Sequence, residues 1–114
     1  MNREKAFEAK CQGDERLNNQ EYSAAIEYYT LALVYFSSDY HIYCKRSLCY
    51  SMNRDAQNAL NDSEECIRLN PHCIKAYALK GEALFNLSKY KESIIELEEG
   101  LKIEIGRASC RERV

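Results

Sequence analysis

The 114-residue sequence contains no tryptophan, one proline and four glycines. Because residues that interrupt helices are scarce and strong helix formers are common, we expect an all-α fold. The longest apolar run, 28–36, is about half of the roughly 20 residues that a membrane span needs, and Thr30 interrupts it. Residues 1–12 are charged and lack the apolar core of a secretory signal. We therefore expect a cytoplasmic protein without a membrane partner.

An excess of positive charge is also missing, since the formal net charge is −2. Binding of nucleic acid needs a clustered basic surface, so nucleic acid is not expected as a partner. The chain has only two histidines, no legible Ser-His-Asp or Cys-His arrangement and no glycine-rich phosphate loop. The sequence thus predicts neither an enzyme nor a small-molecule substrate, and no cofactor.

Six cysteines are present, but nothing else indicates a secreted, disulfide-bonded protein. Five of them fall in or beside helical patterns, where cysteine acts as a small apolar residue, and we interpret them as reduced thiols. A zinc site would need closely and regularly spaced ligands, and Cys44 and Cys49 are expected on different faces of one helix. No metal is predicted among His41, Cys44, Cys49, His72 and Cys73.

The last ten residues, 105–114, break the pattern that precedes them. Their sequence IGRASCRERV can be back-translated into a string that resembles the adapter used in short-read sequencing libraries. We therefore hypothesise that this tail is translated adapter rather than native protein, and that the native chain continues differently beyond Ile103. The alternative is an ordinary basic tail. The codons of the transcript would decide between the two.

Small and aliphatic residues recur with a period of 34. Four sets of positions share this spacing: Gly13, Ser47 and Gly81; Ala25, Ala59 and Ser93; Ala32, Cys66 and Gly100; Ile26, Leu60 and Ile94. Small residues at fixed sites allow two helices to cross closely, and the aliphatic residues fill the space around them. A period of this length indicates stacked supersecondary units.

These residues closely resemble the tetratricopeptide repeat, whose period is 34. Three repeats are in frame, at 6–39, 40–73 and 74–107, and Pro71 occupies the proline position of the second. The resemblance covers a single domain at 3–103. It implies six antiparallel helices in three helix-turn-helix units, forming a short right-handed α-solenoid. A C-terminal capping helix is missing, so we expect Leu97 and Leu101 to be exposed.

Local signals predict where each helix begins and ends. Asp39 is expected to cap one helix, and Asn70-Pro71 to start another. Tight turns are expected at 53–54 and 87–88. The ion pairs Glu64–Arg68 and Glu98–Lys102 are expected on helix surfaces. The predicted helices are 3–18, 21–36, 40–53, 55–69, 72–86 and 90–103.

The resemblance also implies a binding groove. In this family the first helix of each repeat lines a concave surface that holds a segment of another protein, and the equivalent positions can be read from this sequence. The main candidates are Phe7, Lys10, Asp14, Lys45, Leu48, Lys75, Leu79, Glu82 and Phe85. Lysines and apolar residues together suit an extended peptide with a C-terminal carboxylate. The expected function is therefore a protein-interaction adaptor.

The closest sub-pattern is that of co-chaperones, which hold the C-terminal Glu-Glu-Val-Asp tail of cytosolic chaperones with a two-carboxylate clamp. Lys10 and Lys75 match its two lysines. Asp14 and Lys45 replace two asparagines and Leu79 replaces an arginine, so the chaperone tail is one possible partner and another protein segment is favoured. Two alternatives remain open: a recruiting part of a larger enzyme, such as a ubiquitin ligase or prolyl isomerase, and a self-associating structural repeat.

Overall fold

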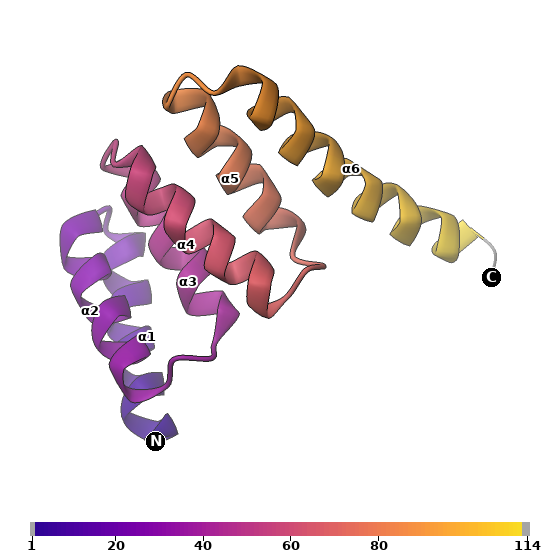
Figure 1. The fold of residues 1–114 in the computed structure, drawn as a ribbon. Coiled ribbons are helices and arrows are strands. Elements are labelled where there is room, and N and C mark those ends of the chain that lie inside the picture. The colour runs from indigo at the N-terminus through magenta and orange to yellow at the C-terminus, as the bar shows by residue number, and fades with distance from the viewer. Residues whose placement is uncertain (1, 113–114) are drawn as a thin grey trace.

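The computed structural model describes the backbone of residues 2–112 and the side chains of residues 2–103. Over this range the chain forms six α-helices, and consecutive helices run antiparallel in a stack of three pairs (Figure 1). The expected all-α fold of three helix-turn-helix units is thus confirmed. The helices are α1 (Arg3–Asn18), α2 (Tyr22–Tyr35), α3 (Tyr40–Met52), α4 (Ala56–Leu69), α5 (Ile74–Asn86) and α6 (Tyr90–Glu112).

Two of the predicted helix limits are wrong by more than one residue. Helix α5 begins at Ile74 with Cys73 as its N-cap, because Asn70 ends α4 and its side chain accepts a hydrogen bond from the His72 amide in the intervening turn. Helix α6 continues past 103 to Glu112 and projects beyond α5 (Figure 1). The side chains of the proposed adapter tail lie outside the described residues, so its origin stays a prediction.

The turns inside the three repeats share one backbone geometry. Gln20, Arg54 and Ser88 lie 34 residues apart and have φ values of 62°, 63° and 65°. In each turn the next residue donates its amide hydrogen to a carbonyl of the preceding helix at 2.8 Å. These left-handed residues end the first helix and reverse the chain within a few residues. The turns expected at 53–54 and 87–88 are confirmed, as is the Asp39 cap of α3.

Close helix crossings explain the recurrence of small residues. A Cβ atom added at Gly13 would lie 2.7 Å from the Tyr29 ring, and one added at Gly81 would lie 2.7 Å from Leu97. The residues equivalent to Gly13 and Tyr29 in the second repeat are Ser47 and Ser63, and both are fully buried. Each crossing thus pairs a small residue with a partner that fits the remaining space.

The core consists of clusters that join neighbouring repeats. One unites α1, α2 and α3 around Tyr29 and Ile42; another unites α3, α4 and α5 around Cys66 and Leu79. The second repeat is also held by a partly buried ion pair, in which the Arg46 guanidinium donates to both carboxylate oxygens of Asp62 at 2.7 and 2.8 Å. These clusters cross the boundaries between repeats, as expected for stacked repeats.

The last described helix exposes two leucines. Leu97 and Leu101 on α6 are 47% and 53% exposed, which confirms the expected uncovered face. The two expected helix-surface ion pairs are wrong by one residue, since Arg68 pairs with Glu65 and Lys102 with Glu99. Residues three apart also share a helix face, so either spacing can pair. Within the described part of the chain, no helix is long and apolar enough to span a membrane.

Candidate peptide-binding groove

The candidate groove residues all come from α1, α3 and α5, the first helices of the three repeats. Two hollows lie along these helices. The first, about 250 Å³, is lined by Phe7 and Lys10 together with residues from the start of α3. The second, about 370 Å³, lies where α3 approaches α5 and is lined by Lys45 and Lys75. The structure therefore places the three lysines along the hollows between the inner helices.

Asp14 is the centre of a polar cluster between α1 and α3. The Lys45 ammonium donates a hydrogen bond to its carboxylate at 2.8 Å, and the Tyr29 hydroxyl donates another at 2.5 Å. Partial burial raises the pKa of Asp14, but these two hydrogen bonds outweigh it, so the pKa lies below its ordinary value. Asp14 is thus ionised and paired, and it neutralises the charge of Lys45.

Lys10 and Lys75 are the groove lysines without an ion-pair partner among the described side chains. Among the described side chains, no carboxylate lies within ion-pair distance of either. The Lys10 ammonium lies 5.7 Å from the centre of the Phe7 ring, in the range of a cation–π contact, and Lys75 is exposed at the start of α5. Lysine is a flexible point charge, so both can reach a carboxylate.

Glu82 makes a second polar link between inner helices. Its carboxylate accepts a hydrogen bond of 3.0 Å from the Ser51 hydroxyl, joining α5 to α3. Asp14 and Glu82 occupy the same position in repeats one and three. The candidate residues Lys10, Lys45, Lys75, Asp14 and Glu82 together carry a net charge of +1, which favours an anionic ligand near the lysines.

The four apolar candidates divide into two kinds. Phe7 and Phe85 are 62% and 59% exposed, at opposite ends of the row of inner helices. Leu48 is half-buried against the core, and Leu79 is only 6% exposed. Leu79 therefore packs beneath the groove, and the two phenylalanines are the apolar groups that remain available to a ligand.

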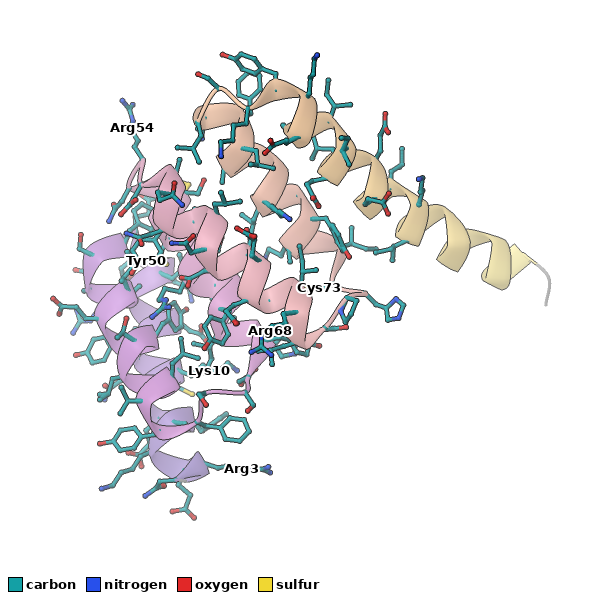
Figure 2. The ribbon with its side chains drawn as sticks, viewed as in Figure 1. Arg3, Lys10, Tyr50, Arg54, Arg68 and Cys73 are labelled. Atoms are coloured by element: carbon teal, nitrogen blue, oxygen red, sulfur yellow. The ribbon has the colours of Figure 1, made fainter. Side chains whose placement is uncertain are left out.

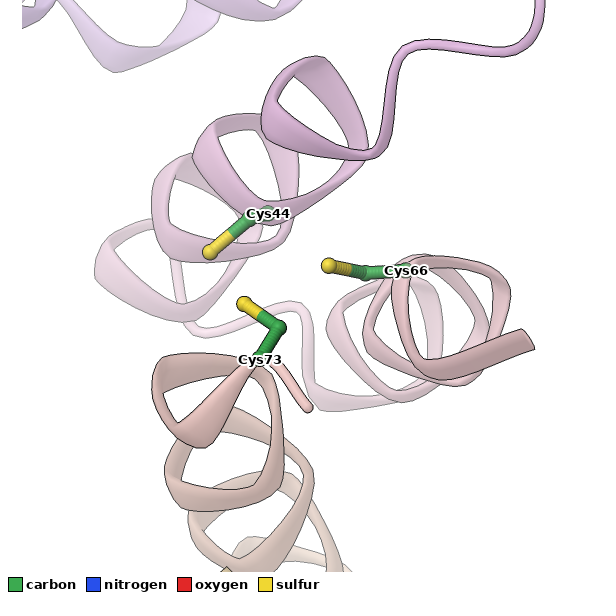
Figure 3. Close-up of side chains that lie close together, drawn as sticks. All are labelled: Cys44, Cys66 and Cys73. Atoms are coloured by element: carbon green, nitrogen blue, oxygen red, sulfur yellow. The ribbon is translucent and has the colours of Figure 1, made fainter. Parts of the chain in front are cut away.

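A cluster of three thiols beside the second hollow was missed by the sequence analysis. Figure 2 shows Cys73 at the start of α5. Its side chain, Cys44 of α3 and Cys66 of α4 point towards one another, with all three sulfurs within 4.8 Å (Figure 3). Spacing along the chain gave no signal, because these residues come from three elements. Cys44 and Cys49 do lie on different faces as predicted, since they belong to separate core clusters.

The thiols of this cluster influence one another. Hydrogen bonding from the Cys66 thiol, together with the positive charges of Lys75 and Lys45, outweighs burial and lowers the pKa of Cys44 to about 7. The pKa of Cys66 is raised, because its thiol is the donor in that hydrogen bond and is buried. The pair thus favours the thiolate of Cys44 over that of Cys66.

Comparison with known sequences finds heat-shock organising proteins. The chain is 33% identical over 103 residues to the Heat shock protein sti1 homolog of Schizosaccharomyces pombe, covering 90% of this chain and 17% of that protein. It is 31% identical over 99 residues to the Hsp70-Hsp90 organizing protein of Triticum aestivum, covering 87% of this chain and 17% of the relative. The chain therefore spans about a sixth of these relatives.

Solved structures with the same fold include the TPR domains of two other proteins. The first TPR of Spaghetti (RPAP3), bound to the HSP90 peptide SRMEEVD, matches with a TM-score of 0.88 at 26% identity, covering 91% of this chain and 82% of that one. The Sgt2 TPR domain from Aspergillus fumigatus matches with a TM-score of 0.82 at 28% identity, covering 87% and 66%. These matches confirm the tetratricopeptide solenoid and the likeness to co-chaperone domains.

A protein-family model also matches most of the chain. The family described as Anaphase-promoting complex, cyclosome, subunit 3 matches residues 18–100, which include most of the first repeat and all of the second. The 34-residue period, the six helices and the solved relatives agree with this match. The chain therefore belongs to the tetratricopeptide-repeat family whose model is described as Anaphase-promoting complex, cyclosome, subunit 3.

Proposed function

We propose that this domain is a protein-interaction adaptor that holds the C-terminal segment of a partner protein in the groove formed by α1, α3 and α5. The observation that carries the proposal is a pair of lysines, Lys10 and Lys75, that make no ion pair with the described side chains and lie on the inner helices beside two hollows. A terminal carboxylate supplies the complementary charge, and the exposed Phe7 and Phe85 rings offer apolar contacts. The domain acts by binding rather than by catalysis.

The partner that the comparisons favour is a chaperone tail. A relative of the same fold is bound to an HSP90 peptide that ends in Glu-Glu-Val-Asp, and the sequence relatives are named as Hsp70-Hsp90 organising proteins. This likeness also supports a cytoplasmic location. Three clamp positions depart from the pattern that the resemblance implies: Asp14 and Lys45 stand in place of asparagine and Leu79 in place of arginine. We therefore expect weaker binding than that of a complete clamp.

The proposal is tested by titrating the domain with a peptide ending in Glu-Glu-Val-Asp, beside the same peptide with an amidated C-terminus. We expect the free acid to bind, the amide to bind more weakly, and salt to reduce the difference between them. Lys75→Ala should weaken binding of the free acid about tenfold, since a charge-assisted hydrogen bond is worth roughly 1.5–3 kcal/mol before screening. Equal binding of acid and amide would refute a carboxylate-binding groove.

Lys91→Ala is the matched control for that substitution. Lys91 is an exposed lysine on the first turn of α6, so its removal changes the net charge by the same amount outside the groove. We expect it to leave the affinity for both peptides unchanged. If Lys75→Ala and Lys91→Ala weaken binding equally, the effect is one of net charge and the groove assignment is wrong.

A further inference from the structure

The cysteine cluster has the composition and the geometry of a metal site. Three sulfur atoms from three different elements converge within 4.8 Å of one another (Figure 3). The centre of a triangle with edges of that length lies about 2.8 Å from each corner, and a zinc–thiolate bond is about 2.3 Å long. Inward movements of roughly 0.5 Å, within the reach of side-chain rotation, would bring the three sulfurs to bonding distance.

Access and charge also suit an ion. Cys44 and Cys73 line the hollow between α3 and α5 together with Lys45 and Lys75, while Cys66 is fully buried. Three thiolates would carry three negative charges close to these two lysines. Two nearby ammonium groups would offset the two negative charges that remain after a monovalent ion is bound.

The donor set indicates which ion. Thiolates are soft ligands that select Cu(I), zinc and iron–sulfur clusters. Zinc in structural sites takes four ligands, and among the described residues the cluster offers three. Cu(I), a d¹⁰ ion that accepts trigonal coordination, is satisfied by three sulfurs. We propose that Cys44, Cys66 and Cys73 form a binding site for one Cu(I) ion, which enters from the hollow between α3 and α5.

Binding requires the release of the thiol protons and involves no change in oxidation state. Each thiol that ligates Cu(I) gives its proton to solvent, and the three thiolate sulfurs donate electron pairs to the ion. Affinity should therefore rise with pH, because protons and the metal compete for the same three sulfur atoms.

The test uses the fully reduced domain under argon, titrated with Cu(I) held by a chromophoric chelator. A Cys11→Ser/Cys110→Ser background removes the exposed thiol of α1 and the cysteine of the tail. We expect one Cu(I) per chain, with an ultraviolet sulfur-to-copper charge-transfer band and three sulfur scatterers in X-ray absorption. If the chelator keeps its copper, or if zinc binds and Cu(I) does not displace it, the proposal is overturned.

Cys73→Ser is the decisive variant, because it should fold while losing one ligand. Cys73 is the N-cap of α5 and makes no side-chain capping hydrogen bond, whereas serine is a preferred N-cap residue. Metal affinity should fall by at least about a hundredfold, more than the 10–100-fold cost of losing a group that only supports a ligand. Thermal unfolding monitors the fold. Unchanged Cu(I) affinity in a folded Cys73→Ser variant would overturn the proposal.

Cys49→Ala is the matched control for a buried cysteine. Cys49 lies on the same helix as Cys44 but in the cluster around Tyr29. Its removal should leave one Cu(I) per chain bound with the same affinity. If Cys49→Ala and Cys73→Ser reduce copper binding equally, the ion is held by unfolded or scattered thiols, and the three-sulfur site is excluded.

Discussion

Replacing Asp14 with asparagine should strengthen the binding of a peptide carboxylate in the groove. Asparagine keeps the shape of the side chain and an oxygen that can accept the hydrogen bond from Tyr29. It removes the carboxylate that now pairs with the Lys45 ammonium, whose nitrogen lies 2.8 Å from an Asp14 oxygen. The net charge of the five charged groove candidates rises from +1 to +2, and the Lys45 ammonium becomes available to a ligand.

The size of the effect follows from exposure. The Lys45 and Asp14 side chains are 31% and 32% exposed, so solvent screens much of their interaction. We expect the freed lysine to contribute about 1 kcal/mol to binding, or about a fivefold gain in affinity. For the same reason the unfolding free energy should fall by less than about 1 kcal/mol.

Isothermal titration calorimetry with the free-acid and amidated peptides measures this prediction directly. The gain should be confined to the free acid and should shrink as salt is added. Glu65→Gln is the control, since it removes one negative charge on α4, where Glu65 pairs with Arg68. If Asp14→Asn leaves the free-acid affinity unchanged, or strengthens both peptides equally, Lys45 does not contribute to carboxylate binding.

Three further predictions concern stability. Asp62→Ala should destabilise the domain by about 2–3 kcal/mol in chemical denaturation, because the Arg46 side chain, which is 17% exposed, loses its carboxylate partner. Arg16→Ala, at an ion pair whose side chains are 42% and 48% exposed, should change the unfolding free energy much less; similar losses would contradict this. Gly13→Ala should lower the melting temperature, because the Tyr29 ring that the new Cβ meets is fully buried and hydrogen-bonded. Gly81→Ala should lower it less, since the Leu97 side chain that it meets is 47% exposed and can rotate away; the reverse order would refute this account of the crossings. Burial and the hydrogen bond to Asp14 raise the pKa of Tyr29 above its ordinary value. The stability that the protonated Tyr29 contributes is therefore present below about pH 10 and is lost as the pH rises beyond it. In a pH series of melting curves, Tyr29→Phe should remove this part of the alkaline loss of stability.

Hydrophobic periodicity and small residues determined the fold. Gly13, Ser47 and Gly81 recur every 34 residues because every repeat must solve the same crossing problem, so a one-dimensional pattern was enough to place three helix pairs. The sequence predicted helix ends less well, because they depend on which side chain accepts a hydrogen bond from a nearby backbone amide. Asp39 caps α3 as predicted, but the Asn70 side chain bonds within the turn before α5 and does not cap the helix.

Only the tertiary structure decided how the groove is charged. The sequence placed Asp14 and Lys45 on facing helices, but their mutual distance and the contribution of Tyr29 depend on how repeats one and two pack. The cysteine cluster is the clearest case. Cys44, Cys66 and Cys73 have no shared spacing in the chain, and they meet because α3, α4 and α5 converge at one point. Contacts that recur in every repeat leave a periodic signal in the sequence. A site that forms once, between repeats, leaves no such signal and is seen only in the tertiary structure.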